Sequence, residues 1–367
     1  MGNALSLFDF GWDREFSEAF KPWAERGLHP ARVVKQLRDL SLLVTQHGER
    51  TGEVSGRFRH EAIHPGDYPV VGDWLAMEPC DEERAVIHAV LPRRSAFIRK
   101  AAGEPVEAQV AAANVDTVFL VSGLDGDFNL KRIERYLTTA WEGGASPVIV
   151  LNKADLKTNL EEITALVAGI APGVPVVSVS ALSGDRLDSL APHLVPRKTV
   201  ALLGSSGVGK STLINRLLGE ERFPTAPVSD AEDGRGRHTT TVRELVRLPG
   251  GALLIDTPGM RELQLWADES GLDRTFDDVE ELATHCRFAD CLHDREPGCA
   301  VQNAVREGSL EARRLESYVK LRREIRFLSL KKDVRTRRQL EKAAGRRFAA
   351  QIKEMKKHKP RYQNPGS

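Results

Sequence analysis

The chain has 367 residues, with 53 Lys and Arg against 52 Asp and Glu. This length favours two or three domains, and 41% hydrophobic with 29% charged residues argues against wholesale disorder. No apolar run approaches the roughly 18 residues that a membrane span needs, and charged residues between Asp9 and Glu15 occupy the place of a signal-peptide core. We therefore expect a cytoplasmic protein without a membrane segment.

The net charge of +1 hides an asymmetry along the chain. Residues 311–367 hold 19 Lys and Arg against 6 Asp and Glu, so the rest of the chain is acidic overall. A basic tail is typical of nucleic-acid-binding proteins, because Lys and Arg at phosphates release condensed counterions. The alternative is a solvated helix face without a partner.

The first third of the chain predicts a short helix and then a barrel. Residues 1–30 carry large apolar side chains at helical spacing, namely Trp12, Phe16, Phe20 and Trp23. Short apolar or alternating runs follow at 42–45, 54–58, 70–77 and 86–91, with Gly, Pro and Asp between them. Several short strands at this spacing favour a small β-barrel. Cys80 stands alone in this region, and we expect it to be packed inside.

From residue 116 onward, predicted strands alternate with predicted helices. Buried-strand runs lie at 118–121, 148–151, 176–179, 200–203 and 253–255, and a helix is expected at 130–139. This alternation favours a parallel α/β sheet. Asp125, Asp127 and Asn129 resemble the start of a calcium loop, but Leu130 replaces the required Gly, so we interpret the segment as a turn.

The chain is predicted to be helical after about residue 262. Residues 311–328 form an amphipathic pattern whose apolar face comprises Leu315, Tyr318, Leu321, Ile325 and Leu328. Residues 356–367 show no apolar periodicity and are expected to form a mobile basic tail.

Residues 204–211 match the phosphate-binding motif G-x-x-x-x-G-K-[ST] between a predicted strand and a predicted helix. The glycines allow backbone N–H groups to surround phosphates, and the following helix N-terminus adds positive charge. Lys210 is expected to reach the β- and γ-phosphates, and Ser211 to ligate Mg²⁺. The expected phosphate-binding residues are Gly204, Ser205, Ser206, Gly207, Val208, Gly209, Lys210, Ser211 and Thr212.

Residues 256–259, Asp-Thr-Pro-Gly, end the predicted strand at 252–255. At that position Asp256 can hold Mg²⁺ through water, and the N–H of Gly259 can meet the γ-phosphate.

Two further segments predict guanine recognition. In Asn152, Lys153, Ala154 and Asp155, the Asp155 carboxylate can accept two hydrogen bonds from guanine, which adenine does not offer. Ser180 and Ala181, after the next strand, can supply a backbone N–H to the guanine O6. The alternative for the first segment alone is a helix start capped by Asn152 or Asp155.

The polar, Gly-rich stretch 234–241 lies where a γ-phosphate-sensing loop is expected. We assign metal sensing to Thr240, with Thr239 and Thr241 as alternatives. Met260 stands where many GTPases have a water-orienting Gln, so slow intrinsic turnover is expected. His238 is the candidate that orients water, the alternative being a solvent-facing histidine. The catalytic candidates are thus Lys210, His238 and Thr240.

Cys286, Cys291, His293 and Cys299 follow the spacing C-x₄-C-x-H-x₅-C. Three thiolates and one imidazole complete a tetrahedral Zn²⁺ shell without room for water, so the site is predicted to be structural. His285 is a possible competing ligand, but it directly adjoins Cys286.

The nucleotide motifs occur in a rotated order, with the guanine segments before the phosphate loop, and this order resembles the circularly permuted GTPases. Together with the barrel and the C-x₄-C-x-H-x₅-C cluster, it resembles the ribosome small subunit-dependent GTPase A family (RsgA, also called YjeQ). Further support comes from residues 71–74, 113–116 and 236–241. The resemblance implies GTP hydrolysis in response to the small ribosomal subunit late in its assembly, and His238 matches the family's switch histidine.

We therefore predict a multidomain monomer that uses GTP/GDP, Mg²⁺ and one structural Zn²⁺, with the small ribosomal subunit and 16S rRNA as partners. The expected parts are an N-terminal helical extension (1–30), an OB-type β-barrel (31–105), a circularly permuted P-loop α/β GTPase (106–262), a helical zinc-binding domain (263–328) and a basic tail (329–367). Candidate RNA-facing charges are Arg57, Arg59, Arg93, Arg94, Arg99 and Lys100. Two alternatives remain: a GTP-gated RNA- or protein-binding module without significant turnover, and an ATP-dependent P-loop kinase.

Overall fold

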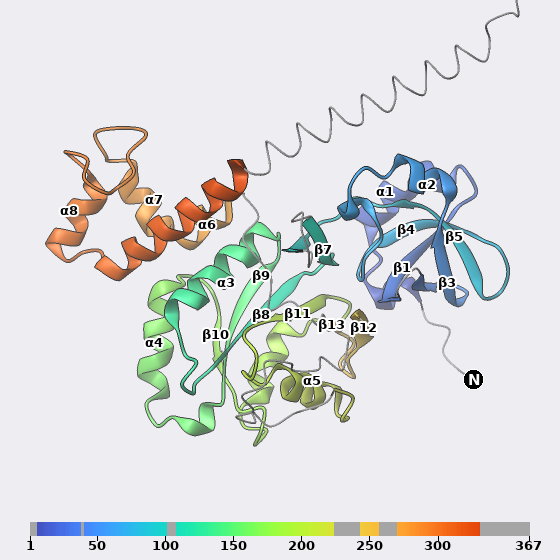
Figure 1. Ribbon diagram of the computed structural model, residues 1–367. Coiled ribbons are helices and arrows are strands. Elements are labelled where there is room, and N and C mark those ends of the chain that lie inside the picture. Colours follow the sequence, from blue (N-terminus) through green and yellow to red (C-terminus); the bar gives the residue numbers. More distant parts are fainter. Residues whose placement is uncertain (1–5, 38–39, 101–107, 224–242, 257–269, 331–367) are drawn as a thin grey trace, which may run out of the picture.

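The computed structural model describes residues 6–37, 40–100, 108–223, 243–256 and 270–330. Figure 1 shows three parts along the chain: an N-terminal barrel, a central α/β layer structure and a helical C-terminal part at the far end. Within the described ranges, no helix is long and apolar enough to cross a membrane.

The central sheet is parallel apart from one strand. The parallel strands, in spatial order, are β10 (Val176–Ser178), β9 (Ser146–Asn152), β8 (Thr117–Gly123), β11 (Thr199–Leu203) and β13 (Leu253–Asp256). This confirms the predicted parallel sheet. On the side next to the barrel, β12 (Arg243–Arg247) pairs antiparallel with β13. The apolar pattern did not predict β12.

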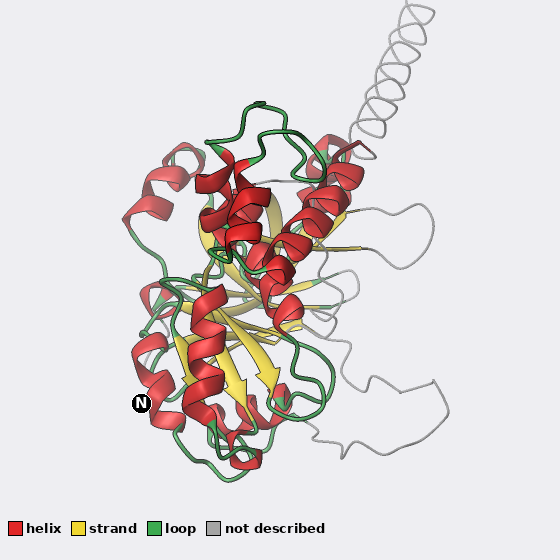
Figure 2. Ribbon diagram, turned by 90° about the vertical axis from the view of Figure 1, so that its left-hand side faces the viewer, coloured by secondary structure: helices red, strands yellow, loops and turns green. Residues whose placement is uncertain are grey.

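Helices pack on both faces of this sheet, and Figure 2 shows helices in front of its strands. Val118 and Leu120 of β8 pack in the cluster that contains residues of α3 (Leu130–Glu142) and α4 (Leu160–Ile170). The intervening Phe119 and Val121 pack with α5 (Lys210–Leu218) in a second cluster. Because successive strand residues point to opposite faces, an unbroken apolar run is what a sheet covered on both sides requires.

The N-terminal barrel closes on itself. Its strands are β1 (His29–Gln36), β2 (Ser41–Thr45), β3 (Gly48–Val54), β4 (Trp74–Pro79) and β5 (Arg84–Val90), in the order β1-β2-β3-β5-β4. The β4–β1 pairing closes the ring, and β3 and β5 run parallel. These five strands confirm the predicted OB-type barrel.

Two predicted strands of the barrel were placed wrongly. The run 54–58 is not a strand, because β3 ends at Val54 and α2 (Gly56–Glu61) follows. Ser55 sets this boundary, since its side chain accepts a hydrogen bond from the N–H of Phe58 as the helix N-cap. The strand expected at 70–77 begins only at Trp74, because Gly72 turns the backbone with a φ of 93°.

Three further expectations about single residues were wrong. Cys80 is exposed rather than packed. Arg93 is paired with the buried Asp73, at 2.7 Å, and donates to the carbonyl of Gly66. Arg94 pairs with Asp13, so the charges of both arginines are used within the protein. Arg57 and Arg59 are exposed as expected, whereas the side chains of Arg99 and Lys100 lie outside the described residues.

The barrel is joined to the central sheet through β1. Lys35 and Gln36 of β1 lie opposite Glu244 and Arg243 of β12, so one ladder of hydrogen bonds runs from the barrel into the central layer. A separate hairpin of β6 (Ala96–Lys100) and β7 (Ala108–Ala113) leads from the barrel towards β8.

The N-terminal residues form η1 (Leu7–Phe10) and α1 (Arg14–Ala24), and so confirm the predicted helix. Trp12 packs edge-on against the fully buried Trp74, with ring centroids 4.8 Å apart, and Phe16 lies 5.6 Å from the same ring. The amphipathic spacing thus covers one end of the barrel with aromatic surface.

Arg32 of β1 is buried where the N-terminal segment, the barrel and the central sheet meet. Its guanidinium donates to the carbonyls of Phe10 and Gly72 and, at 2.9 Å, to Oγ1 of Thr199. Burial lowers the pKa of Arg32 to about 10, which leaves the group charged at neutral pH. One side chain therefore satisfies acceptors from three separate parts of the chain.

The C-terminal part comprises α6 (Ser270–Thr275), α7 (Asp277–Ala283), α8 (Ala300–Glu307) and a long helix over residues 312–330. The long helix buries Leu315, Tyr318, Leu321 and Ile325 against this small core, which confirms the predicted apolar face. The basic tail expected at 329–367 lies almost wholly outside the described residues.

Replacing Arg32 by Ala tests whether this side chain stabilises the junction of the N-terminal segment, the barrel and the central sheet. We expect Arg32→Ala to lower the free energy of unfolding by about 3 kcal/mol or more, because several buried acceptors lose their donor together. Urea unfolding measures the change. The exposed Arg57→Ala is the matched control and should stay within about 0.5 kcal/mol; equal effects of the two variants would contradict the assignment.

Candidate nucleotide site and metal centre

The segments predicted to hold a nucleotide all follow the carboxyl ends of parallel strands. Asn152 ends β9, Ser180 follows β10, Gly204 follows β11 and Asp256 ends β13. Since these strands are neighbours in a parallel sheet, the four segments meet along one edge, where α/β proteins bind ligands. The rotated motif order is therefore no obstacle to a single site.

Asn152 directly connects three of these segments. Its side chain is almost fully buried. Nδ2 donates to the carbonyl of Val208 at 2.8 Å, and Oδ1 accepts from the N–H of Ala181 at 2.9 Å. One amide thus fixes the phosphate loop against both predicted guanine segments.

The side-chain amide of Asn152 also explains why residue 209 of the phosphate loop is a glycine. Gly209 has a φ of 91°, and a Cβ placed on it would lie 2.3 Å from Nδ2 of Asn152. Gly204 is equally confined, because a Cβ there would lie 2.3 Å from the carbonyl oxygen of Val121 on β8. Both glycines of the motif are therefore required by close packing as well as by phosphate access.

The phosphate loop holds its lysine in place. Nζ of Lys210 donates to the carbonyl oxygens of Gly204, at 2.7 Å, and Ser205. Val208 is buried, while Ser206 and Gly207 are exposed at the rim. α5 starts at Lys210 without a side-chain cap, so its first N–H groups, which include Ser211 and Thr212, are available to an anion.

Two residues that the sequence analysis did not assign to the site, Asp125 and Arg216, contact the predicted guanine segments. Lys153 adopts a left-handed backbone with a φ of 62°, and its ammonium pairs with Asp125 in the β8–α3 turn. Arg216 of α5 donates to the carbonyls of Ala181, at 3.1 Å, and Leu182, at 2.7 Å. No local signal marks Arg216. Asp125 had been assigned to a turn, and its partner was not predicted.

Asp155 and Ser180, two of the predicted guanine-binding residues, differ in burial. Asp155 is exposed, so its carboxylate can accept hydrogen bonds from a ligand. Ser180 is fully buried, and its Oγ accepts from the N–H of Ser183 at 3.2 Å, which shapes the loop that carries the N–H of Ala181. Ala154 is buried beneath them.

Asp256 fits the expected role beside Mg²⁺. Burial raises the pKa of its carboxyl to about 6; the Lys210 ammonium opposes this rise and Glu244 adds to it. A carboxylate that is disfavoured by burial is stabilised by a bound cation. His238, Thr240 and Gly259, which complete the predicted γ-phosphate contacts, lie outside the described residues.

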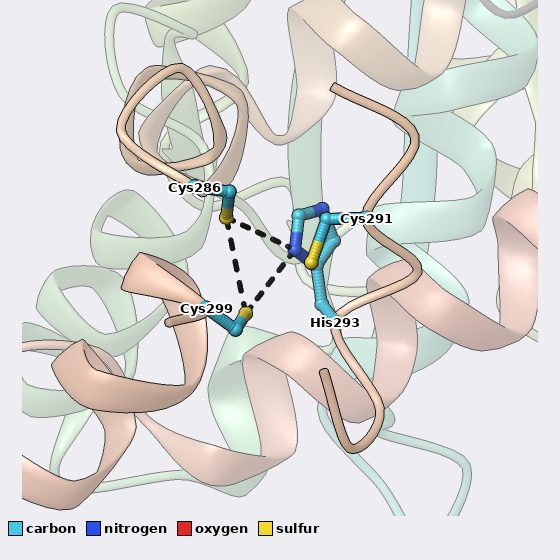
Figure 3. A group of neighbouring side chains, drawn as sticks. All are labelled: Cys286, Cys291, His293 and Cys299. Carbon is cyan, nitrogen blue, oxygen red and sulfur yellow. Dashed lines mark hydrogen bonds between the residues drawn. The ribbon is translucent and has the colours of Figure 1, made fainter. Parts of the chain in front are cut away.

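The four predicted zinc ligands come together in the C-terminal part. Figure 3 shows the sulfur atoms of Cys286, Cys291 and Cys299 and the ring of His293 facing one another, and their ligand atoms all lie within 4.8 Å. Nδ1 of His293 lies 3.6 Å from Sγ of Cys286 and 3.5 Å from Sγ of Cys299, and these two sulfurs are 3.9 Å apart.

The separations among the ligand atoms of Cys286, His293 and Cys299 are close to those around a tetrahedral ion. Zn²⁺ with bonds of about 2.3 Å to sulfur and about 2.0 Å to nitrogen places its ligand atoms roughly 3.5 to 3.8 Å apart. His285 is not part of this group of converging ligand atoms, and its Nδ1 lies 3.1 Å from Oγ1 of Thr284. The donor set therefore fits zinc.

The surrounding backbone is shaped to present these ligands. His293 and Gly298 adopt left-handed φ values of 58° and 77°, and Nε2 of Gln302 donates to the carbonyl of His293 at 2.7 Å. Cys299 is also the N-cap of α8, where its sulfur accepts from the N–H of Gln302. The cluster thus fixes the start of α8 and the preceding loop.

Comparison with known proteins agrees with this architecture. A family model described as RsgA GTPase matches residues 90–266. A protein of Opitutus terrae named small ribosomal subunit biogenesis GTPase RsgA is 52% identical over 90% of this chain and 92% of its own length. One of the same name from Streptomyces coelicolor is 45% identical over 95% of this chain and 94% of its own length.

Two solved structures share the fold. The crystal structure of YjeQ from Thermotoga maritima has a TM-score of 0.61 at 28% identity, covering 81% of this chain and 98% of its own. That of YloQ, described as a circularly permuted GTPase, has a TM-score of 0.59 at 25% identity, covering 82% and 95%. The rotated motifs, the barrel and the Cys₃His cluster thus have one common explanation: the chain is a circularly permuted GTPase and belongs to the RsgA GTPase family.

Proposed function

We propose that this protein is a GTPase of small ribosomal subunit biogenesis, which binds the subunit in its GTP state, hydrolyses GTP in response and then dissociates. The observation that carries the nucleotide site is the Asn152 amide, which holds the phosphate loop and the guanine segments together. The partner is suggested by the names of the relatives at 45% and 52% identity.

In the proposed site, each segment binds one portion of GTP. Asp155 accepts from guanine, the N–H of Ala181 donates to the guanine O6, and Lys210 contacts the β- and γ-phosphates. Ser211, Thr240 and Asp256 hold Mg²⁺, which neutralises the charge that develops on the phosphates. The phosphate contacts come from Gly204, Ser205, Ser206, Gly207, Val208, Gly209, Thr212 and Gly259.

The proposed hydrolysis is slow without the partner. Met260 has no polar group to orient a water molecule, so this role passes to His238. Contact with the small subunit would bring His238 and Thr240 to the γ-phosphate.

The proposed partner surface includes 16S rRNA. Arg57 and Arg59 on α2 are exposed, and residues 331–367, with 13 Lys and Arg against 3 Asp and Glu, can follow RNA phosphates. Barrels of this type bind nucleic acid on an open face. We propose that the protein acts as a monomer in the cytoplasm, where small subunits assemble.

The Cys₃His cluster is proposed to hold one structural zinc ion. Four protein ligands leave no open position for water or substrate. The core around it is small and includes Cys291 and Cys299 themselves, so the ion would supply much of the stability of this part.

The central test compares GTP hydrolysis with and without purified small subunits. We expect stimulation by about tenfold or more, as partner-ordered GTPase sites show, and we expect His238→Ala to lose it.

Co-sedimentation should show more binding with a non-hydrolysable GTP analogue than with GDP. Nucleotide-gated binding without stimulation would instead favour a binding module with no significant turnover.

Base selectivity tests the guanine assignment. Because Asp155 pairs with two guanine donors, Asp155→Asn should weaken GDP binding by on the order of 10² or more and leave the weak binding of ADP unchanged. Titration with fluorescent nucleotides measures both. Asp188→Asn, another exposed aspartate, is the matched control; wild-type GDP affinity in Asp155→Asn would refute the assignment.

Zinc removal tests the metal centre. Elemental analysis should find one zinc per chain, and a chelator should make residues 270–330 sensitive to protease because the small core loses its central tie. Cys299→Ser should behave like the chelated protein, while Cys80→Ser, an exposed cysteine outside the cluster, should not. A zinc-free protein that resists protease equally well would contradict a structural ion.

A further inference from the structure

Helix α3 lies between the nucleotide site and the zinc-bearing C-terminal part. It follows directly from the β8–α3 turn that touches the nucleotide site, and Figure 1 shows the C-terminal helices beside it. Its charged residues face two directions: Arg132 contacts the phosphate loop, whereas Lys131, Glu134 and Arg135 contact the helix over residues 312–330. None of these residues was singled out by the motif analysis.

Arg132 of α3 contacts the phosphate loop of the proposed nucleotide site. Its Nη1 donates to Oγ of Ser205 at 2.6 Å and also pairs with Asp127. The hydroxyl of Tyr136, one helical turn further on, lies 3.3 Å from the same Oγ. The carbonyl of Ser205 in turn accepts from Nζ of Lys210. Arg132 therefore fixes the residue against which the phosphate-binding lysine is placed.

The turn before α3 reaches the guanine side as well. Asp125 pairs with Lys153 of the guanine segment, and Oδ1 of Asp125 accepts from the N–H of Asp127 at 3.1 Å. Asp127 is the partner of Arg132. A displacement of α3 would consequently act on both ends of the nucleotide site.

The same N-terminal half of α3 is also bound to the C-terminal part through a buried arginine. Arg314 donates to Oε1 of Glu134 at 3.0 Å, to Asp278 of α7 at 2.7 Å and to the carbonyl of Thr275 at 2.8 Å. Its side chain and that of Glu134 are only 6% and 4% exposed. Breaking such a pair leaves an uncompensated buried charge, so separating α3 from Arg314 is energetically costly.

Two outer pairs flank this buried contact. Arg135 binds Glu324 through both guanidinium ends, at 2.6 and 2.7 Å, and Lys131 meets Glu316 at 2.9 Å. The paired bonds between Arg135 and Glu324 fix orientation as well as distance. Arg132 and Arg135 lie three residues apart in the same helix, so a displacement of α3 moves the backbone of both.

We propose that α3 relays the position of the zinc-bearing part to the nucleotide site, with Arg132 as the positioning residue at the nucleotide end. The inference rests on the proposed nucleotide site. By reciprocity, a change at the Arg135–Glu324 contact alters nucleotide affinity, and bound nucleotide alters how the C-terminal part is held. A partner that binds the C-terminal part would thereby change the positions of Ser205 and Lys210.

A chain of contacts does not by itself establish coupling, so the test is a double-mutant cycle on nucleotide binding. GDP affinity is measured with a fluorescent analogue for the wild type, Arg132→Gln, Arg135→Gln and the double variant, all in the full chain. We expect Arg132→Gln to weaken binding by about tenfold and Arg135→Gln by about fivefold. In the Arg132→Gln background, the second substitution should have no further effect.

Matched variants separate positioning from loss of fold. Arg132→Lys keeps a charge for Asp127 and one donor for Ser205, so it should restore most of the affinity. Lys21→Gln removes the cation of an ion pair in another helix, α1, and should bind GDP normally. Thermal unfolding of each variant shows whether it is folded at the temperature of the titration.

The outcomes divide clearly. Normal GDP binding by Arg132→Gln, failure of Arg132→Lys to rescue it, or equal effects of Arg135→Gln in both backgrounds would overturn the relay. A wild-type chain that does not bind GDP would instead refute the proposed nucleotide site. Loss of binding in Arg132→Gln, rescue by Lys and a non-additive cycle would support the relay.

Discussion

The side-chain amide of Asn152 is the contact on which the nucleotide site depends. It is buried, and it uses its donor on the phosphate loop and its acceptor on the 180–182 loop. An unsatisfied amide at this depth would be costly, so the two loops are held in one arrangement. The chain order of the segments is then irrelevant to the site, because strand neighbours in the sheet decide which loops meet.

Circular permutation has a mechanical consequence for the rest of the molecule. β13, which ends in Asp256, leads along the chain towards the C-terminal part with the Cys₃His cluster, while that part packs back on α3 through Arg314 and Arg135. The nucleotide site is thus connected to the C-terminal part both along the chain and through side-chain contacts. On the opposite side, Arg32 and the β1–β12 pairing join the barrel to the same sheet.

Much of the fold and of the site could be predicted, but some segments and side chains were misplaced. The parallel strands, the helix at 130–142 and the amphipathic face of the last described helix all follow from local apolar patterns. The prediction of a strand at 54–58 was wrong because Ser55 is the N-cap of a helix, and this capping bond decides the local structure despite the two apolar residues of the run. Arg93 and Arg94 were assigned to RNA although Asp73 and Asp13, both distant in the sequence, bind them.

The sequence by itself determined the chemistry: the phosphate loop, the guanine segments and the Cys₃His cluster. These motifs are short, and their function depends on backbone turns and ligand atoms that a few adjacent residues specify. Only the tertiary structure decided which charged side chains work inside the protein, as Arg32, Arg132 and Arg314 do. The physical reason is that the partner of a long charged side chain comes from another part of the chain, and no local pattern records it.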